Sequence, residues 1–418
     1  MFKSQIKISP VHNWLAERTG LGSQLNPKRL EEYQLAKLRE LMDYVQTRSS
    51  FYKSKLGAEG SRIVESLDDL ADLPFLTAGE LISRGEEMIC VPQSRVARVI
   101  TISTSGTAGQ PKRLFFSESD LELCLDFFAH GMLTMVEKGD RVEIHLPGNS
   151  PDGVVDLLRT GLKRAQVDSV WRDPAGPQNI PEGDCLVGMP ANLYQLAQIY
   201  PEARPKSVLL CADYVPESII EALKKIWMTN VFTHYGSTES GQGGGVECAA
   251  HDGYHIREAD LLIEIIDPVT RRPVPPGAVG EIVLTTLTRQ AMPLIRYRTG
   301  DMASRIDSPC ACGSNLSRLG KAMGRFDNVI KMKSGAFISI HQLDEIMFRF
   351  PEVLDYQAAL NSGLDRLDLT VRPHLVAPDP EVLIEQFRSL IDASLLITYT
   401  LDWRCPSALP LKRTIQRL

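Results

Sequence analysis

The sequence predicts an α/β fold, and three changes along the chain support this. Strand-like and helical patterns alternate up to about residue 233, which favours a mostly parallel sheet covered by helices. After residue 245, two strand-like runs joined by a turn rich in proline and glycine predict a β-rich subdomain. The last part of the chain has the size of a small α+β domain. We therefore expect a large N-terminal domain over residues 1–323 and a small, mobile, hinge-connected domain over residues 324–418.

The first predicted strands, at residues 96–102 and 113–116, flank a glycine-rich segment and predict a hairpin. A helix follows, because apolar residues recur every three or four positions on one face. Ser119 with Glu122 matches the pattern of a capping box at its start. The apolar positions of this helix are Leu121, Cys124, Leu125, Phe128 and Met132.

The later elements follow the same two periodicities. The predicted strands of the α/β part lie at residues 140–146, 207–210 and 231–233, and its predicted helices at 154–163 and 217–226. The predicted hairpin of the β-rich part has strands at 261–267 and 281–287. The predicted elements of the C-terminal part are helices at 341–349 and 380–392 and a strand near 367–372.

Composition narrows the class of protein. The chain has 418 residues, of which 43% are hydrophobic and 23% charged, as in ordinary globular enzymes. Its net charge of −6 predicts no nucleic-acid partner. It has no apolar run near the roughly 20 residues that span a membrane, and residues 1–20 lack the apolar core of a signal peptide. We therefore expect a cytoplasmic protein with no membrane partner, whose eight cysteines are reduced.

The segment between the first two strands is the most informative motif. Hydroxyl residues alternate with glycines there, and a lysine closes the run, so that backbone N–H groups, hydroxyls and one cation can surround a polyphosphate. The spacing does not fit the P-loop, in which Gly-Lys-Ser/Thr ends the loop. An ordinary hairpin turn is the alternative interpretation. The residues concerned are Thr104, Ser105, Gly106, Thr107, Ala108, Gly109 and Lys112.

Three further short motifs suggest a nucleotide site. Residues 235–239 follow a strand, where ligands of α/β sheets usually bind; their aromatic ring can stack on a base and their carboxylate can hold Mg²⁺. Residues 297–301 end in Asp301, which can accept hydrogen bonds from a ribose diol. Residues 324–328 lie at the expected domain boundary, where Arg325 can reach a phosphate and Asp327 can act as a hinge. Each motif alone is also compatible with a plain surface turn.

Taken in order, these motifs resemble the adenylate-forming superfamily of acyl-coenzyme A synthetases, most closely its phenylacetate–coenzyme A ligase branch. The runs at 281–288 and 292–301 are specific to that branch, and the resemblance extends from about Tyr44 to the last residues. It implies a two-step reaction. A carboxylate attacks the α-phosphate of ATP to give an acyl-adenylate and pyrophosphate. The small domain then rotates, and the thiol of coenzyme A displaces AMP.

The resemblance also implies residue roles. The glycine-rich loop, with Thr107 and Lys112, would bind the β- and γ-phosphates, and Asp301 would hold the ribose. Glu239 would help to bind Mg²⁺, and Arg325 would contact the nucleotide near the pivot at Asp327. The adenine side would be formed by Asp213, Tyr235, Gly236 and Thr238.

Three positions depart from the family pattern. Ala108 replaces a threonine of the loop, so one hydroxyl is missing, and Asp213 follows Cys211 and Ala212 where the family has Gly-Ala-Glu. The catalytic lysine of the family lies near its C-terminus, usually after a glycine. Lys412 is the only lysine of the tail here, but no glycine precedes it. We expect Lys412 to be the adenylation lysine, with a solvated terminal lysine as the alternative.

Cysteine and histidine residues in the β-rich part suggest a structural Zn²⁺ site. Cys310 and Cys312 form a tight pair, and Cys248 follows a glycine run. Three thiolates and one imidazole make a tetrahedral zinc site, with His255 favoured over His251 as the fourth ligand. Some ligases of the phenylacetate–coenzyme A ligase branch, which this chain resembles, have a comparable cluster. Reduced cysteines without metal are the alternative.

The motifs leave the acceptor and the acid open. The acceptor is expected to be coenzyme A, but a cofactor or a protein thiol is an alternative, and a non-catalytic ATP-binding protein is another. The acid is a small-molecule carboxylic acid, with an aryl acid as the default. The polar, glycine-rich segment at 147–153 argues against phenylacetate itself. A homodimer is compatible with the sequence.

Overall fold

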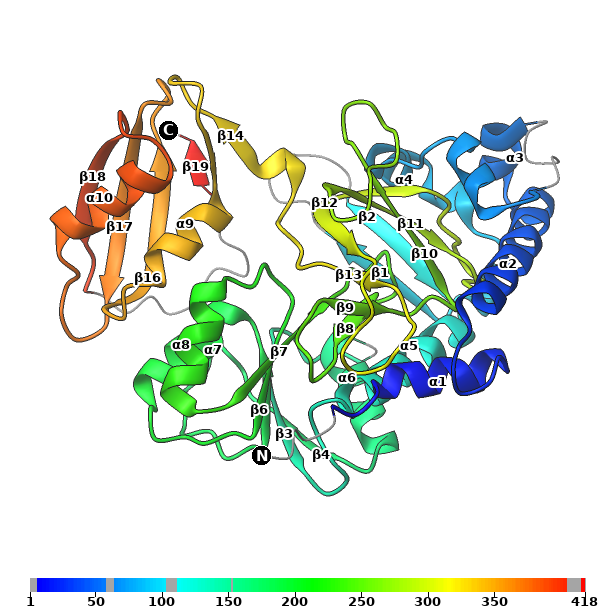
Figure 1. Cartoon of the computed structure of the whole chain (residues 1–418), viewed down its shortest axis with the longest axis horizontal. Helices are drawn as coiled ribbons and strands as arrows, with labels where there is room; N and C mark the ends of the chain where they lie inside the picture. Colours follow the sequence, from blue (N-terminus) through cyan, green and yellow to red (C-terminus); the bar gives the residue numbers. More distant parts are fainter. Residues whose placement is uncertain (1–5, 58–63, 103–110, 152, 404–414, 418) are drawn as a thin grey trace. The chain divides into compact units, whose positions relative to one another are not determined.

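The computed structural model describes residues 6–57, 64–102, 111–151, 153–403 and 415–417. Helices and strands are mixed along the chain, which confirms the predicted α/β class (Figure 1). The chain forms two compact units, each made of separate stretches. The first unit comprises Met1–Thr134, Asp156–Ala165 and His234–Ala322, and the second comprises Met135–Val155, Gln166–Thr233 and Met323–Leu418. The division into domains at residues 323 and 324 stays a prediction.

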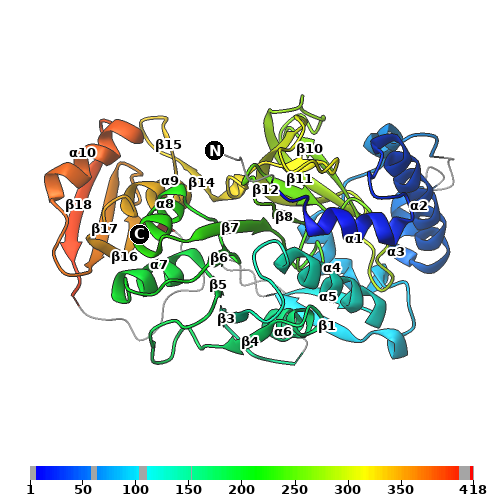
Figure 2. The ribbon, with the colours of Figure 1, turned by 60° about the horizontal axis from the view of Figure 1, so that its bottom comes forward.

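Helices form one side of the first unit. Proline begins both α1 and α2, where its missing N–H costs nothing, and Asn26 caps α2 by accepting from the backbone N–H groups of Lys28 and Arg29. Helix α1 lies along α5, with the Trp14 ring stacked on His130 at 5.4 Å (Figures 1 and 2). The helices here are α1 Pro10–Thr19, α2 Pro27–Arg48, α3 Ser50–Leu56, α4 Ala78–Arg84, α5 Glu118–Met132 and most of α6 Val154–Arg164, with short 3₁₀ turns at Leu67–Asp72, Gly85–Met88 and Gln93–Arg95.

The predicted hairpin before α5 is confirmed. Strands β1 (Arg98–Ile102) and β2 (Lys112–Phe116) are antiparallel, with Ile102 opposite Lys112. The predicted capping box of the next helix was placed two residues too late. Ser117 caps α5 and Asp120 completes the box, because the helix begins at Glu118.

The β-rich part of the first unit is a run of mostly antiparallel strands. Strands β10 and β11 pair in register from Leu261 with Thr286 to Ile266 with Glu281, which confirms the predicted hairpin. The order of neighbouring strands brings segments together that are far apart in sequence. That order is β10 Leu261–Ile266, β11 Val279–Thr286, β12 Tyr297–Ile306, β13 Arg318–Leu319, β9 Tyr254–Ile256 and β8 Gly245–Glu247, followed by β7 Asn230–Tyr235.

The second unit contains the predicted parallel sheet. Its strands follow the order β7, β6, β5, β3, β4, and every neighbouring pair in this run is parallel. Helices join β3 to β4, β5 to β6 and β6 to β7, as in α/β crossover connections, whereas a segment without a helix joins β4 to β5. The new elements are β3 Arg141–His145, β4 Asp168–Trp171, β5 Cys185–Gly188, β6 Ser207–Leu210, α7 Pro190–Ile199 and α8 Glu217–Trp227.

The C-terminal segment completes the second unit. A mixed sheet in the order β18, β17, β16, β19 packs its apolar side chains with those of α9, α10 and α8 in one hydrophobic cluster. Ser339 and Gln342 form a capping box at the start of α9. The elements are β14 Val329–Lys331, β15 Phe337–Ser339, α9 Ile340–Met347, β16 Val353–Leu360, β17 Arg366–Pro373, α10 Pro380–Leu390, β18 Leu396–Leu401 and β19 Ile415–Arg417, with a 3₁₀ turn at Phe326–Asn328.

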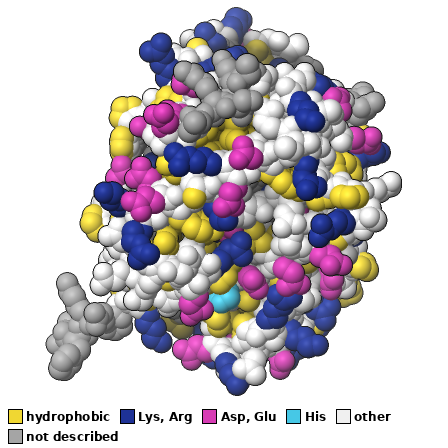
Figure 3. Space-filling model, turned by 90° about the vertical axis from the view of Figure 1, so that its right-hand side faces the viewer, with side chains coloured by type: hydrophobic (Ala, Val, Ile, Leu, Met, Phe, Trp, Pro, Cys, Tyr) yellow, Lys and Arg dark blue, Asp and Glu magenta, His cyan; other side chains and the backbone are white. Residues whose placement is uncertain are grey.

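The surface that carries α2 and α3 has basic and acidic side chains interspersed (Figure 3). Such a mixture does not form the basic stripe of a nucleic-acid interface on this face. Among the described residues, no helix combines the length and the apolar character that crossing a membrane requires.

Candidate active site and metal centre

A buried lysine and a buried glutamate of two separate motifs meet in the first unit. The ammonium group of Lys112, at the start of β2, contacts Glu239 Oε1, in the loop that follows β7. Tyr297, at the start of β12, lies beside both: its hydroxyl accepts from Lys112 Nζ at 3.1 Å and donates to Glu239 Oε1 at 3.0 Å. Lys112 is 8% exposed and Glu239 7%. The motif at 297–301 had suggested a role for Asp301 but none for Tyr297.

Electrostatics keep the Glu239 carboxyl ionised. Burial acts to raise its pKa, but the charge of Lys112 and the hydrogen bonds from Lys112 and Tyr297 outweigh this and lower the pKa below its ordinary value. A carboxylate and an ammonium group at the same buried point offer one ligand for a metal cation and one for a phosphate anion.

The adenine and ribose residues of the predicted site also meet. The hydroxyl of Tyr235, at the end of β7, donates to Asp301 Oδ2 at 3.1 Å. Thr299 holds the backbone of Asp301 within β12, because its Oγ1 accepts the Asp301 N–H at 3.0 Å. Burial, reinforced by the neighbouring Asp301, raises the pKa of the Tyr235 hydroxyl well above its ordinary value. Tyr235 therefore stays protonated and able to donate at neutral pH.

The loop between β7 and β8 has a tight backbone that only small residues allow. A Cβ on Gly236 would lie 2.9 Å from Gly243 Cα, so a larger residue there would push the two arms of the loop apart. Ser237 and Ser240 exchange hydrogen bonds, and the Gly241 N–H donates to the Thr238 carbonyl at 3.1 Å. These bonds hold Glu239 at the tip of a turn, which explains the glycines and serines of the motif.

Several predicted residues lie outside the described part of the chain. These are Thr104, Ser105, Gly106, Thr107 and Gly109 of the glycine-rich loop, and Lys412 of the tail. Their roles stay predictions.

Asp213 and Arg325 belong to the second unit. Asp213 lies beyond the end of β6, and its Oδ1 accepts the backbone N–H of Tyr214 at 2.9 Å. Arg325 is exposed and follows Gly324, whose φ of +89° only glycine adopts easily. A Cβ on Gly324 would lie 2.2 Å from the His341 ring. Gly324 is therefore required both by its backbone angle and by the closeness of the His341 ring. The nucleotide contacts of Asp213 and Arg325 stay predictions.

Glu345 makes a contact next to Asp213 that no sequence motif indicated. The Glu345 carboxylate, on α9, accepts the Glu217 N–H at 2.7 Å and the Ser218 N–H at 3.1 Å, at the start of α8. It also accepts the Tyr214 hydroxyl at 3.2 Å. A carboxylate at this end of a helix is favoured by the helix dipole and by the unpaired N–H groups. No local pattern shows the pairing, because Tyr214 and Glu345 are far apart in sequence.

The structure brings the predicted metal ligands together. The ligand atoms of Cys248, His255, Cys310 and Cys312 all lie within 4.8 Å of one another, and all four residues are buried. The Cys248 and Cys310 sulfurs are 3.6 Å apart, and Cys312 Sγ lies 3.4 Å from His255 Nε2. Two thiolates of a tetrahedral zinc site are roughly 3.7 Å apart. The residues therefore fit a tetrahedral metal ion.

The strand order explains this cluster. Cys248 follows β8, His255 lies on β9, and the two other cysteines precede β13, which is the neighbour of β9. The Ala250 N–H points at Cys248 Sγ at 3.4 Å, the kind of bond that supports a metal-bound thiolate. Hydrogen bonds from Cys248 and His255 lower the pKa of the Cys312 thiol below its ordinary value, although burial acts to raise it. His251 is outside the cluster, with its Nδ1 3.4 Å from Glu247 Oε2.

Comparison with known proteins gives relatives of one kind. No protein-family model matches the chain. The phenylacetate–coenzyme A ligase of Thermus thermophilus is 28% identical over 369 residues, which cover 82% of this chain and 81% of that ligase. The phenylacetate–coenzyme A ligase of Pseudomonas putida is 25% identical over 371 residues, with 82% and 81% covered.

Solved structures show the same architecture. The crystal structure of 2-hydroxyisobutyryl-CoA ligase in the postadenylation state, in complex with 2-HIB-AMP, has a TM-score of 0.79 and 18% identity. The alignment covers 94% of this chain and 90% of that one, and it bears on the fold. The chain is therefore similar to phenylacetate–coenzyme A ligases over most of its length, and it shares the fold of an acyl-coenzyme A ligase.

Proposed function

We propose that the chain is an AMP-forming acid–thiol ligase. It activates a carboxylic acid with ATP and passes the acyl group to coenzyme A. The buried contact between Lys112 and Glu239 is the observation that best supports this, because it offers a phosphate-binding cation and a metal-binding carboxylate at one point. The similarity to phenylacetate–coenzyme A ligases supports the choice of acid and thiol as substrates.

In the first step, a carboxylate oxygen of the acid bonds to the α-phosphorus of ATP, and the bond to the bridging oxygen breaks as pyrophosphate leaves. Lys112 neutralises charge on the phosphates that depart, and Glu239 would hold Mg²⁺, which would supply further positive charge there. Tyr235 and Asp301, which bond to each other, bind the adenosine and orient the α-phosphate. Lys412 is the expected partner of the attacking carboxylate.

In the second step, the thiolate of coenzyme A bonds to the acyl carbon, and AMP departs with the electrons of the acyl–phosphate bond. AMP is a much better leaving group than the oxide ion that a free carboxylate would have to release. The acid is therefore activated first. The small C-terminal domain, with Arg325 near its start, is the expected moving part.

The decisive experiment measures pyrophosphate release with aryl, fatty and small polar acids, each with and without coenzyme A. We expect one acid class to give release, and AMP to appear in stoichiometric amounts only when coenzyme A is added. AMP release with another acceptor alone would favour a different adenylating enzyme. ATP binding without pyrophosphate exchange for any acid would favour a non-catalytic protein.

Lys412→Ala should lose adenylate formation and keep thioester formation from supplied acyl-adenylate.

We also propose that Cys248, His255, Cys310 and Cys312 hold a structural Zn²⁺ ion. Their geometry and burial support this. All four ligands are provided by the protein, so no position remains for a catalytic water, and the ion would join the segment after β8, strand β9 and the segment before β13. A cytoplasmic location and a homodimer stay predictions.

A further inference from the structure

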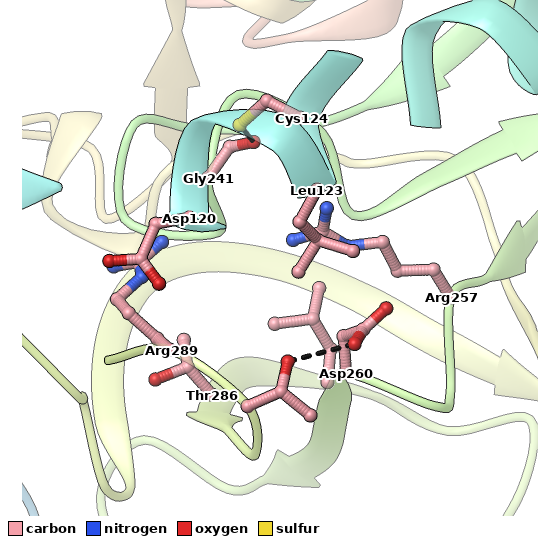
Figure 4. Close-up of a pocket in the computed structure, with 10 residues that line it drawn as sticks. Asp120, Leu123, Cys124, Gly241, Arg257, Asp260, Thr286 and Arg289 are labelled. Carbon is pink, nitrogen blue, oxygen red and sulfur yellow. Dashed lines mark hydrogen bonds between the residues drawn. The ribbon is translucent and has the colours of Figure 1, made fainter. Parts of the chain in front are cut away.

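The loop that carries Glu239 is held by two buried side chains. A small cavity of about 10 Å³ lies inside the first unit, and Gly241 of this loop forms part of its wall (Figure 4). Arg257 and Cys124 line the same cavity and contact the loop backbone, and Figure 4 shows the Cys124 sulfur beside Gly241. The position of Glu239 therefore depends on groups beyond those that bond to its carboxylate.

Arg257 contacts the loop at two points. Its Nη2 donates to the Ser240 carbonyl at 2.5 Å, and its backbone N–H donates to the Gly244 carbonyl at 3.0 Å. Ser240 directly follows Glu239, so one residue fixes both ends of the segment 240–244. Arg257 is 2% exposed, and a hydrogen bond from a charged donor is stronger than one from a neutral donor. The segment that follows Glu239 is therefore tied firmly to Arg257.

Cys124 adds a third contact, within the same segment. Its thiol, on α5, donates to the Gly241 carbonyl. Burial raises the pKa of this thiol, so it stays protonated and able to donate at neutral pH. Gly241 has a φ of +77°, and a Cβ there would lie 3.2 Å from Arg257 Nη2. Glycine therefore lets the backbone approach both Arg257 and α5 closely.

The Arg257 side chain is itself held in place. Its guanidinium lies 5.4 Å from the centroid of the Phe127 ring, and a Cβ on Gly243 would lie 2.2 Å from the same ring. Arg257 Nε and Nη1 and Asp260 Oδ2 have no hydrogen-bond partner among the described residues. The cavity has the space of about one water molecule, which can bridge these groups. Arg257 therefore has a fixed position from which to hold the loop.

We propose that Arg257, assisted by Cys124, is a positioning residue for Glu239. This inference rests on the proposed role of Glu239 as a ligand of Mg²⁺. Lys112 holds the carboxylate before ligands arrive, but it is expected to turn to the phosphates when ATP binds. The backbone of the two residues after Glu239 would then keep the carboxylate in place. Outer contacts of this kind orient a metal ligand and raise the affinity for the metal.

The test measures ATP binding by calorimetry at a series of free Mg²⁺ concentrations, without acid, so that no acyl-adenylate forms. The quantity compared is the Mg²⁺ concentration that gives half of the maximal gain in ATP affinity. We expect Arg257→Met to raise this concentration about tenfold, as the loss of outer contacts does at metal sites. A residue that only stabilised the fold would lower the unfolding temperature and leave this concentration unchanged.

Arg318→Met is the matched control. Arg318 is an equally buried arginine of the first unit, 1% exposed, and it donates to Asp252 and Ser308. This variant should lose stability and keep the half-saturating Mg²⁺ concentration of the wild type. An unchanged concentration in Arg257→Met, or an equal rise in Arg318→Met, would overturn the proposal.

A milder variant covers the case in which Arg257→Met does not fold. Cys124→Ala removes the donor to Gly241 and should raise the half-saturating Mg²⁺ concentration about threefold, through the loss of one hydrogen bond. Cys90→Ala, which changes a buried thiol that donates to the Met88 carbonyl at 3.5 Å, should leave it unchanged. The proposal fails if the two cysteine variants behave alike.

Glu239→Gln separates this inference from the proposed function. It should raise the half-saturating Mg²⁺ concentration at least as much as Arg257→Met does. If it leaves the concentration unchanged, the role of Glu239 as a metal ligand is wrong. If it raises the concentration and neither Arg257→Met nor Cys124→Ala does, the role of Glu239 stands and only the positioning role is wrong.

Discussion

The hydroxyl of Tyr297 donates a hydrogen bond to Glu239 Oε1 at 3.0 Å and accepts one from Lys112 Nζ at 3.1 Å. This phenol therefore sets where the two charged groups lie, although it carries no charge itself. Its position at the start of β12, four residues before Asp301, links the proposed phosphate-binding residues to the proposed ribose-binding residue.

Tyr297→Phe should raise the KM for MgATP at least about tenfold with little change in the KM for the acid, because 1.4 kcal/mol of lost positioning corresponds to that factor. The fold should lose about 1 kcal/mol with the two hydrogen bonds. Steady-state kinetics and urea unfolding measure the two effects.

Tyr52→Phe is the matched control. The Tyr52 hydroxyl is equally buried and also makes two hydrogen bonds, to the Pro293 carbonyl at 2.9 Å and from the Ile295 N–H at 3.1 Å. It should lose similar stability and keep the KM for MgATP. A parallel rise in that KM for both variants would show that Tyr297 matters only for the fold.

Lys112→Met and Glu239→Gln should each destabilise the chain by roughly 3 kcal/mol, because each leaves the other member of a buried pair without its partner. The double variant should be less destabilised than the sum of the two single variants. Urea unfolding of all four proteins gives the coupling free energy. Additive effects would mean that the two groups do not interact in solution.

The contribution of this pair should depend on pH. The folded state lowers the pKa of Glu239 below its ordinary value of 4.5, so the unfolded chain binds the proton more readily. The stabilisation is therefore complete above the unfolded pKa and is lost as the pH falls through the folded pKa. The difference in unfolding free energy between the wild type and Glu239→Gln should stay constant from pH 7 to about 5 and shrink below about 4.5. A difference that grows on acidification would contradict the assignment.

Removal of metal should unfold the β-rich part first. We expect about one zinc per chain in purified protein and a large fall in unfolding temperature with a strong chelator. Cys312→Ser should lose the metal, whereas Cys90→Ser, which changes a buried cysteine outside the cluster, should keep it. Elemental analysis and thermal unfolding report the result without reference to activity. Full stability without metal would remove the zinc proposal.

Glu345→Ala should destabilise the second unit by about 1 kcal/mol, since it takes an acceptor from the first N–H groups of α8. The exposed Glu385 of α10 offers a control at which alanine should change stability very little. Hydrogen exchange at Glu217 and Ser218 should speed up in the first variant alone. Unchanged exchange at these two amides would show that Glu345 does not cap α8.

Sequence patterns predicted those helices and strands that are marked by a regular local spacing of apolar residues or by a cap. The hairpin of β1 and β2, the strands around β6 and the helices α8 to α10 follow from spacing and caps. It missed β5, because four buried residues between loops have no alternating pattern. The capping box of α5 was misplaced since Ser117 and Ser119 both precede an acidic residue at the right distance, and only the helix start distinguishes them.

The candidate site was predictable residue by residue but not as pairs. The motifs identified Lys112, Tyr235, Glu239 and Asp301, yet the contact of Lys112 with Glu239 depends on which strands lie side by side. The same holds for the metal cluster. Spacing left His251 and His255 both possible, and the pairing of β9 with β13 brings only His255 to the cysteines.

The contact between Lys112 and Glu239 has a consequence for the order of events at the site. Each group already has a counterion, so arrival of ligands is an exchange of partners. Binding of nucleotide without metal would draw Lys112 away and leave the Glu239 carboxylate without a counterion. Binding of metal without nucleotide would leave the Lys112 ammonium group without one. We therefore expect Mg²⁺ and ATP to enter with strong mutual cooperativity, each raising the affinity for the other by the same factor.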